Sequence, residues 1–425
     1  MTRRRWVYTG LGLTVVLAAG LLVWRPWTGQ EPCAAAVTAT DGPAPAPRLE
    51  LPDRVAPPFG RQRVVVPGTG RMAVGGTLVL RDGDVVGAVD ARTGERLWAF
   101  EQHGDVYGAS QVGGELVLLQ RGDDAPATAV GVGIENGEVR DCVTFPGGER
   151  AAETATVVDV ARRTVALLRR HEDTTTLSLV DPNRPEPVWT SEPAVPPSVE
   201  YAHAAGDVIV LGAAGEDGTS AWELAVDERD RVTPADRRLY AYAAEDGAPL
   251  WDWAHEDFAP QVVGMAFDTV VVRAARFDEP ANVLHNRLVA LDARTGEERW
   301  SAELPPTAAK YHERSVLLGD VVVSSESDPE RGTFAHLTAR DLATGEPLWR
   351  IDNRVNALEH AALVGDLALV PGRSLRGLEL IDVRTGESRT LFDGVSVLGA
   401  SADGTSIALQ VVTDGEPVTV TYDRA

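Results

Sequence analysis

The amino-acid sequence predicts an all-β protein: an eight-bladed β-propeller of four-stranded blades, preceded by one transmembrane helix. Three observations predict it: an uncharged apolar stretch near the N-terminus, a strand–turn–strand phrase that recurs along the chain, and a second phrase before most copies of the first. Hydrophobic residues make up 44% of the 425 residues, enough for a large core. In chain order we expect a cytoplasmic stub with a signal anchor (residues 1–27), a Pro/Ala-rich extracytoplasmic linker (28–60) and the propeller (61–425).

The anchor is predicted from residues 6–24, which contain no charged side chain and follow three arginines at positions 3–5. A helix of about 19 residues rising 1.5 Å per residue just crosses the hydrocarbon core of a bilayer. The arginines favour a cytoplasmic N-terminus. No small-residue cleavage site directly follows the apolar stretch, so we expect an uncleaved, single-pass protein of the cell membrane with its propeller outside the cytoplasm.

The linker contains the chain's first cysteine. Proline without a packed apolar face gives an extended, semi-rigid spacer, which we expect for residues 28–60. The chain has two cysteines, Cys33 and Cys142. Outside the cytoplasm such a pair is more often a disulfide than a reactive site, so we expect a bond that ties the linker to the rim of the second blade. Two free thiols are the alternative.

The recurring phrase consists of alternating apolar residues, Asp, two residues, Thr-Gly, three residues and Trp, as in residues 86–98. The alternation predicts a strand with one buried face. Asp bonds to the backbone of the bend, and Gly supplies the positive φ of a tight turn. Trp then returns on the next strand as an anchor between adjacent sheets. The expected docking residues are Asp90, Gly94, Trp98, Trp189, Gly247, Trp251, Asp292, Gly296, Trp300, Asp341, Gly345, Trp349, Asp382 and Gly386.

The second phrase is a small apolar run that ends in Gly-Asp and is followed by about four strand residues, as at Gly319-Asp320. Its last copy, at Asp403-Gly404, leads to a strand that ends with the chain before any Trp. Eight inner hairpins therefore meet seven outer strands. We expect residues 63–66 to supply the missing strand and to close the ring, which removes open sheet edges. Seven blades are the alternative, if the last hairpin completes the first blade.

These phrases resemble the PQQ-binding-like β-propeller repeat family, also called the quinoprotein alcohol dehydrogenase-like fold, over nearly everything after residue 60. The resemblance implies a membrane-anchored bacterial member of a family that contains both quinone-cofactor dehydrogenases and non-enzymatic scaffolds. The dehydrogenases are similar to one another in a vicinal Cys pair, a calcium ion held by Glu, Asn and Asp, and a catalytic Asp. This chain has no adjacent cysteines, and no such ligand set stands out. We therefore expect no catalytic residue, no metal and no cofactor; a PQQ-dependent dehydrogenase is the less favoured alternative.

The charge and the longest insertion indicate a protein partner. A net charge of −23 repels phosphate backbones, so we expect no nucleic-acid binding. Insertions on one face of a repeat protein often mark its binding face. The longest, residues 214–237 in the fourth blade, is the predicted partner-binding loop, with Glu216, Asp217, Trp222, Glu223, Asp227, Glu228 and Asp230. We expect a non-catalytic, monomeric propeller that binds an envelope protein as a scaffold. Simple solvated acidic loops are the alternative reading.

A second function is possible at the central channel. Tyr107, His203, Arg314 and His360 hold comparable positions in their repeats and are expected near the channel mouth. A polar ring there predicts, as the alternative function, a sensor of a small ligand or carbohydrate. Such residues can equally hold ordered water.

Overall fold

The computed structural model consists almost entirely of antiparallel strands. It describes residues 37–39, 57–82, 85–102, 105–112, 115–122, 125–144, 157–160, 164–171, 174–180, 187–191, 199–213, 238–255, 258–278, 280–308, 314–328, 333–352, 355, 358–372, 376–413 and 415–425. Within these ranges the single helix is the short 3₁₀ turn η1 (Leu358–His360), and no helix is long and apolar enough to span a bilayer. The predicted anchor at residues 6–24 lies outside the described residues.

The first half of the chain forms four sheets that follow one another along the sequence. Their strands are β3 (Thr69–Val74), β4 (Thr77–Asp82), β5 (Val85–Asp90) and β6 (Arg96–Gln102); β7 (Asp105–Val112), β8 (Glu115–Gly122), β9 (Ala125–Gly133) and β10 (Val139–Thr144); β11 (Val157–Val160), β12 (Thr164–His171), β13 (Thr174–Val180) and β14 (Trp189–Thr190); and β15 (Val199–Ala205), β16 (Val208–Ala213), β17 (Leu239–Ala243) and β18 (Pro249–Trp253).

The second half continues the pattern in three further sheets. One contains β19 (Ala259–Ala266), β20 (Thr269–Asp278), β21 (Val283–Asp292) and β22 (Glu298–Glu303), with β23 (Thr307–Ala308) paired to β21. The next contains β24 (Ser315–Leu318), β25 (Val321–Asp328), β26 (Thr333–Asp341) and β27 (Pro347–Asp352). The last joins β28 (Ala362–Val364), β29 (Leu367–Pro371), β30 (Arg376–Asp382), β31 (Ser388–Ala402), β32 (Ser406–Thr413), β33 (Glu416–Arg424) and β2 (Phe59–Pro67).

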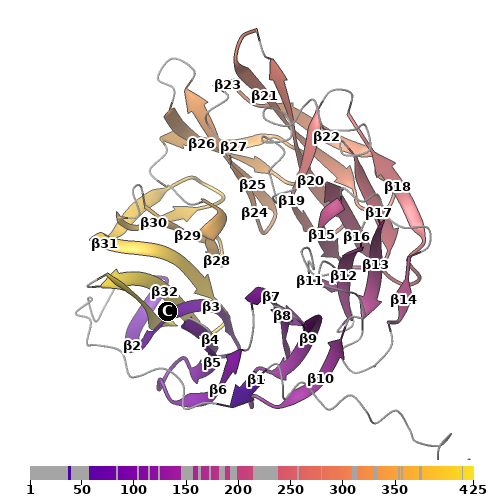
Figure 1. Cartoon of the computed structure of the whole chain (residues 1–425). Helices are drawn as coiled ribbons and strands as arrows, with labels where there is room; N and C mark the ends of the chain where they lie inside the picture. Colours follow the sequence, from indigo (N-terminus) through magenta and orange to yellow (C-terminus); the bar gives the residue numbers. More distant parts are fainter. Residues whose placement is uncertain are drawn as a thin grey trace, which may run out of the picture.

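The sheets lie in a ring with strands such as β7, β11, β15 and β28 toward the centre, and β2 meets the C-terminal strand β33 at the lower left of Figure 1. Neighbouring inner strands touch: β11 contacts β7 and β15, and β19 contacts β15 and β24. The architecture is a β-propeller, as the sequence predicts. Because each sheet buries both faces against its neighbours, the core is a series of apolar layers between sheets.

Strand β2 closes the ring. It pairs antiparallel with β33, with Val65 opposite Val420 and Val66 opposite Thr419, so the predicted pairing of residues 63–66 with the C-terminal strand is confirmed. Strand β31 is long because its first part pairs with β30 and its last part with β32. Divided within β31, the strands fall into the eight groups of four that the eight-blade prediction requires. The first group has four strands of its own, β3–β6, so it does not need the last hairpin to complete it. The blade number itself stays a prediction.

One short strand lies inside the segment expected to be an extended spacer. Strand β1 (Val37–Ala39) pairs with β6, with Val37 opposite Gln102, and adds a fifth strand to the β3–β6 sheet. A spacer needs no partner, but the outer strand of a sheet offers free backbone groups, and this part of the linker uses them.

Five outer-strand tryptophans each join their own sheet to the next one. The indole Nε1–H of Trp98 donates to the Ile134 carbonyl oxygen at 2.8 Å, and that of Trp300 donates to Leu342 O at 2.7 Å. Each ring covers a turn glycine, so a Cβ on Gly345 would lie 2.6 Å from the Trp300 ring. The same hydrogen bond is made by Trp189 to Ala244 O, Trp251 to Ala293 O and Trp349 to Val383 O. At the closure, Val64 of β2 covers Gly94, and the Thr421 hydroxyl donates to Ala91 O at 2.7 Å.

Candidate functional site

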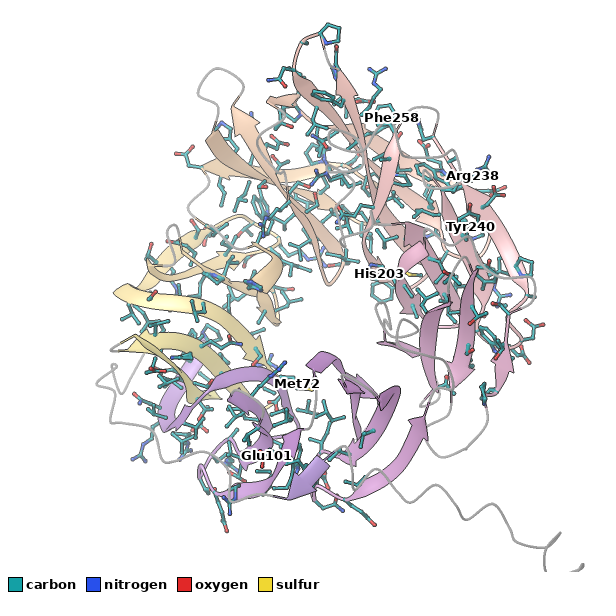
Figure 2. All side chains as sticks on the ribbon, viewed as in Figure 1. Met72, Glu101, His203, Arg238, Tyr240 and Phe258 are labelled. Atoms are coloured by element: carbon teal, nitrogen blue, oxygen red, sulfur yellow. The ribbon has the colours of Figure 1, made fainter. Side chains whose placement is uncertain are left out.

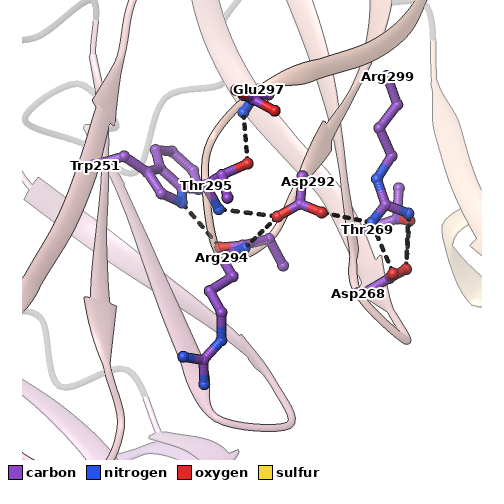
Figure 3. Close-up of polar contacts among 9 residues, drawn as sticks. Trp251, Asp268, Thr269, Asp292, Arg294, Thr295, Glu297 and Arg299 are labelled. Atoms are coloured by element: carbon purple, nitrogen blue, oxygen red, sulfur yellow. Dashed lines mark hydrogen bonds and ion pairs between the residues drawn. The ribbon is translucent and has the colours of Figure 1, made fainter.

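The Asp-Thr-Gly turns use their carboxylates to hold their own backbone. Asp292 accepts the N–H groups of Arg294 at 3.0 Å and Thr295 at 2.9 Å (Figure 3). Arg299 Nη2 donates to Asp292 at 2.6 Å and to Asp268, in the turn between β19 and β20, at 2.7 Å. The Arg299 guanidinium, helped by these N–H groups, lowers the pKa of Asp292 to about 2. These carboxylates are fixed in structural contacts, which is a poor arrangement for proton transfer at neutral pH.

Charged pairs on this face link the Asp-Thr-Gly turn of one sheet to the inner hairpin of the preceding sheet. Arg294 contacts Asp207, in the β15–β16 turn, and Arg384 contacts Asp320, in the β24–β25 turn. All four side chains are well exposed, so each pair contributes little to stability. Because they link turns at the same end of the sheets, they mark this end as one continuous surface, which we call the turn face.

The turn face carries one exposed aromatic residue, Phe267, that the sequence analysis missed. It lies between β19 and β20 with φ 57°, where the matching turns have Gly206 (φ 62°), Gly319 (φ 65°) and Gly365 (φ 61°). Its side chain is 79% exposed, the highest value among the described large apolar side chains. A left-handed backbone is unfavourable for any residue with a Cβ, and most of all for a bulky one. The available signal was Phe267-Asp268 in place of the Gly-Asp of the second phrase.

The four predicted channel residues come from four different parts of the ring. Tyr107 lies on β7, and its side chain is outside the described part. His203 lies on β15, and Figure 2 shows it on the central side of that sheet. Burial lowers the pKa of His203 to about 4, so its imidazole is neutral at pH 7. Arg314 and His360 are exposed; Arg314 directly precedes β24, and η1, which contains His360, packs against β24. The structure therefore brings the elements of Arg314 and His360 together.

Two predicted sites fall on residues that the structure leaves undescribed. The partner-binding loop, with Glu216, Asp217, Trp222, Glu223, Asp227, Glu228 and Asp230, lies wholly within 214–237, outside the described ranges. Cys33 also lies outside them. Cys142 is on β10, opposite Val130, but its side chain is not described. The Cys33–Cys142 bond stays a prediction.

The chain lacks the vicinal cysteine pair of the dehydrogenases, and the described residues show no carboxylate-rich cluster. In the described ranges, no three or more His, Cys, Asp or Glu side chains are grouped so that they could hold a metal ion. The chain's two cysteines are not adjacent, so a vicinal disulfide cannot form. We derive no reaction step through the calcium–quinone group of the dehydrogenases.

Comparison with known proteins gives one family and two kinds of relative. A family model described as outer membrane protein assembly factor BamB matches residues 173–389. BamB from Moraxella catarrhalis superposes with a TM-score of 0.52 at 14% identity, covering 85% of this chain and 96% of that protein.

The two curated relatives are enzymes and match shorter segments. Lanthanide-dependent methanol dehydrogenase of Methylorubrum extorquens is 32% identical over 124 residues, 28% of this chain and 20% of that enzyme. Quinohemoprotein alcohol dehydrogenase ADH-IIG of Pseudomonas putida is 30% identical over 143 residues, 31% of this chain and 19% of that enzyme. The chain therefore spans about a fifth of the length of the curated relatives it matches.

Proposed function

From the premise that the chain belongs to the family described as outer membrane protein assembly factor BamB, we propose that it is a non-catalytic propeller that binds other proteins as a scaffold at the bacterial cell envelope. The observation that carries the proposal is how much of the chain the family model matches. The family model matches residues 173–389, about half of the chain. By sequence, the two curated dehydrogenases match 28% and 31% of this chain. A shared repeat supports a common scaffold better than a common activity.

The location follows from the N-terminal sequence. An apolar helix at residues 6–24 would anchor the chain in the membrane, with residues 3–5 keeping the N-terminus in the cytoplasm. The propeller would then meet its partner outside the cytoplasm. Because the chain is strongly acidic, a partner with a basic surface would be attracted to it.

Two surfaces are candidates for the contact. One is the acidic insertion 214–237, with Trp222 as its aromatic anchor. The other is the turn face around Phe267, where the structure keeps a strained backbone that glycine would relieve. A strained backbone of this kind is kept where the side chain serves a function that outweighs the loss of stability, and binding a partner through the exposed Phe267 ring is such a function. Packed sheets hold the turn face in place, so a partner that binds there loses little ordering entropy on this side of the complex.

Photo-crosslinking in intact cells tests the proposal. A tagged full-length chain would carry a photoreactive residue at position 222, at position 267, or at position 97 as the control, where Leu97 is 40% exposed on the outer strand β6. We expect one dominant envelope protein to be crosslinked from position 222 or 267 and much less from position 97. Equal, diffuse crosslinking from all three positions, or no reproducible protein, would contradict a scaffold function.

A further inference from the structure

The interface between the β19–β22 sheet and the β24–β27 sheet contains a cluster of buried polar side chains. Val271 and Leu288 of the first sheet pack with Val322 of the second. Side chains two residues further along a strand point to the same side. Arg273 and Asn286 therefore face the second sheet, whose facing side chains are Ser324, Glu326 and Thr338. These five are between 0% and 5% exposed. The layer between the β15–β18 and β19–β22 sheets has a core of apolar side chains such as Val210, Val272 and Val289.

Most of these polar groups are paired within the interface. Arg273 Nε donates to Asn286 Oδ1 at 3.3 Å, and Asn286 Nδ2 donates to Thr307 Oγ1 at 3.0 Å. The Glu326 carboxylate lies 3.2 Å from Arg350 Nε. Burying polar groups in this way is tolerated because each bond replaces one lost to water.

Two donors at the edge of the cluster are not paired. The Thr338 hydroxyl oxygen and the Arg340 Nε are buried atoms without a hydrogen-bond partner among the described residues. Thr338 as a whole is 5% exposed. Both side chains lie on the same face of β26, two residues apart. A buried donor without a partner costs about 1–3 kcal/mol, so such groups call for an explanation.

Both side chains line a cavity of about 540 Å³ between the two sheets, which is broadly open to solvent. Glu303 and Leu304, at the end of β22, form one wall, and Leu348 and Arg350 of β27 contribute to the other. This volume falls in the range of small-molecule sites. The lining thus combines apolar side chains such as Leu304 and Leu348 with charged ones, and with two donor atoms that have no partner among the described residues.

The charges around the cavity indicate what charge a ligand should carry. Glu326 is paired with Arg350, and Glu303 lies 3.6 Å from Arg287. Arg340 donates Nη1–H to the Gly345 carbonyl oxygen, but no carboxylate pairs with it in the described ranges. Among the described residues, the Arg340 charge therefore has no carboxylate partner, and the Thr338 hydroxyl has no hydrogen-bond partner. A carboxylate matches them, because it accepts hydrogen bonds from both and carries one negative charge. A phosphate dianion would bring excess negative charge close to two glutamates.

We propose that this cavity is a binding site for a small monocarboxylate with an apolar body. Its carboxylate accepts hydrogen bonds from the Thr338 hydroxyl and Arg340 Nε–H, and its apolar part lies against Leu304 and Leu348. Arg350 stays paired with Glu326 and shapes the cavity. This proposal does not rest on the proposed scaffold function, because it is argued from the cavity and its unpaired donors alone.

The test measures binding to the full-length chain by ligand-observed saturation-transfer NMR and by thermal unfolding. The probes are butyrate and benzoate as monocarboxylates, with inorganic phosphate for comparison. We expect the monocarboxylates to bind and to raise the unfolding midpoint by linkage. Losing one charge-assisted hydrogen bond should weaken binding by about tenfold or more, so Thr338→Val and Arg340→Gln should both reduce it. Arg384→Gln, which removes an exposed arginine on the turn face, is the matched control and should bind normally.

Thermal unfolding of the variants without ligand tests separately whether the Thr338 hydroxyl is unpaired. Thr338→Val keeps the side-chain shape and removes an unpaired hydroxyl, so its midpoint without ligand should equal or exceed that of the natural chain. A lower midpoint would show that the hydroxyl is already bonded, and the proposal would fall. It would also fall if neither monocarboxylate bound, if phosphate bound in their place, or if both variants bound them as well as the natural chain.

Discussion

Replacing Trp98 by Ala measures directly what one outer-strand anchor contributes. The side chain is 7% exposed and packs with Phe100, at a ring-centroid distance of 5.4 Å. A tryptophan buries about 150–250 Å², which at about 25 cal/mol per Å² corresponds to about 4–6 kcal/mol. If the neighbouring sheet moves partly into the space left by the indole, it recovers some of this burial energy. We therefore expect a loss of about 3–5 kcal/mol in the free energy of unfolding.

The assay is urea unfolding of the full-length chain followed by circular dichroism, which reports the midpoint and the m value. Leu97→Ala is the matched control, because Leu97 is the preceding residue of the same strand and is 40% exposed; its loss should stay below about 1 kcal/mol. Trp98→Phe should fall in between, since it keeps an aromatic ring but loses the hydrogen bond to Ile134 O. If Trp98→Ala cost no more than Leu97→Ala, our account of how the sheets dock would be wrong.

Three further predictions concern single residues. Burial lowers the pKa of His203 from 6.5 to about 4, so between these pH values the unfolded chain binds a proton that the folded chain does not. The free energy of unfolding should therefore fall as the pH is lowered from 6.5 to about 4, and a pH series should show a smaller fall in His203→Gln. The pKa of Asp292 is lowered from 3.8 to about 2, so its contribution to stability is present above pH 4 and is lost as the pH falls toward 2; thermal midpoints should show this loss in the natural chain and not in Asp292→Asn. Gly345→Ala puts a Cβ into a left-handed backbone and against Trp300, and should cost about 1–2 kcal/mol or more in urea unfolding, whereas Gly404→Ala, at an open site, should be nearly neutral.

Much of the fold could be predicted from the chain because its repeat is local. A turn with positive φ favours glycine, and a half-buried strand favours alternation, so Gly94, Gly296 and Gly345 mark hairpins before any tertiary contact is known. The count of inner and outer strands then required a strand from the start of the chain, and β2 is that strand. The predicted site was harder to place. The insertion 214–237 stands out by length and charge, but neither property says what it contacts.

The ring explains one residue that breaks the repeat. The sequence alone shows Thr390 where other copies have Trp, without a reason. In the structure, the neighbouring strands β33 and β2 come from the two ends of the chain, so no Asp-Thr-Gly turn connects them. A tryptophan at position 390 would therefore lack the turn glycine on which the others dock, and Thr390 instead bonds to Glu379 within its own sheet.

The sequence by itself determined the hairpins, their turns and the strand that closes the ring, because each depends on residues a few positions apart or on a simple count. Only the tertiary structure decided which carbonyl each tryptophan meets, that Phe267 stands exposed in a glycine position, and that Thr338 and Arg340 lie unpaired beside a cavity. These depend on the distance and facing of neighbouring sheets. That geometry is set when the whole ring closes, and no local pattern in the chain encodes it.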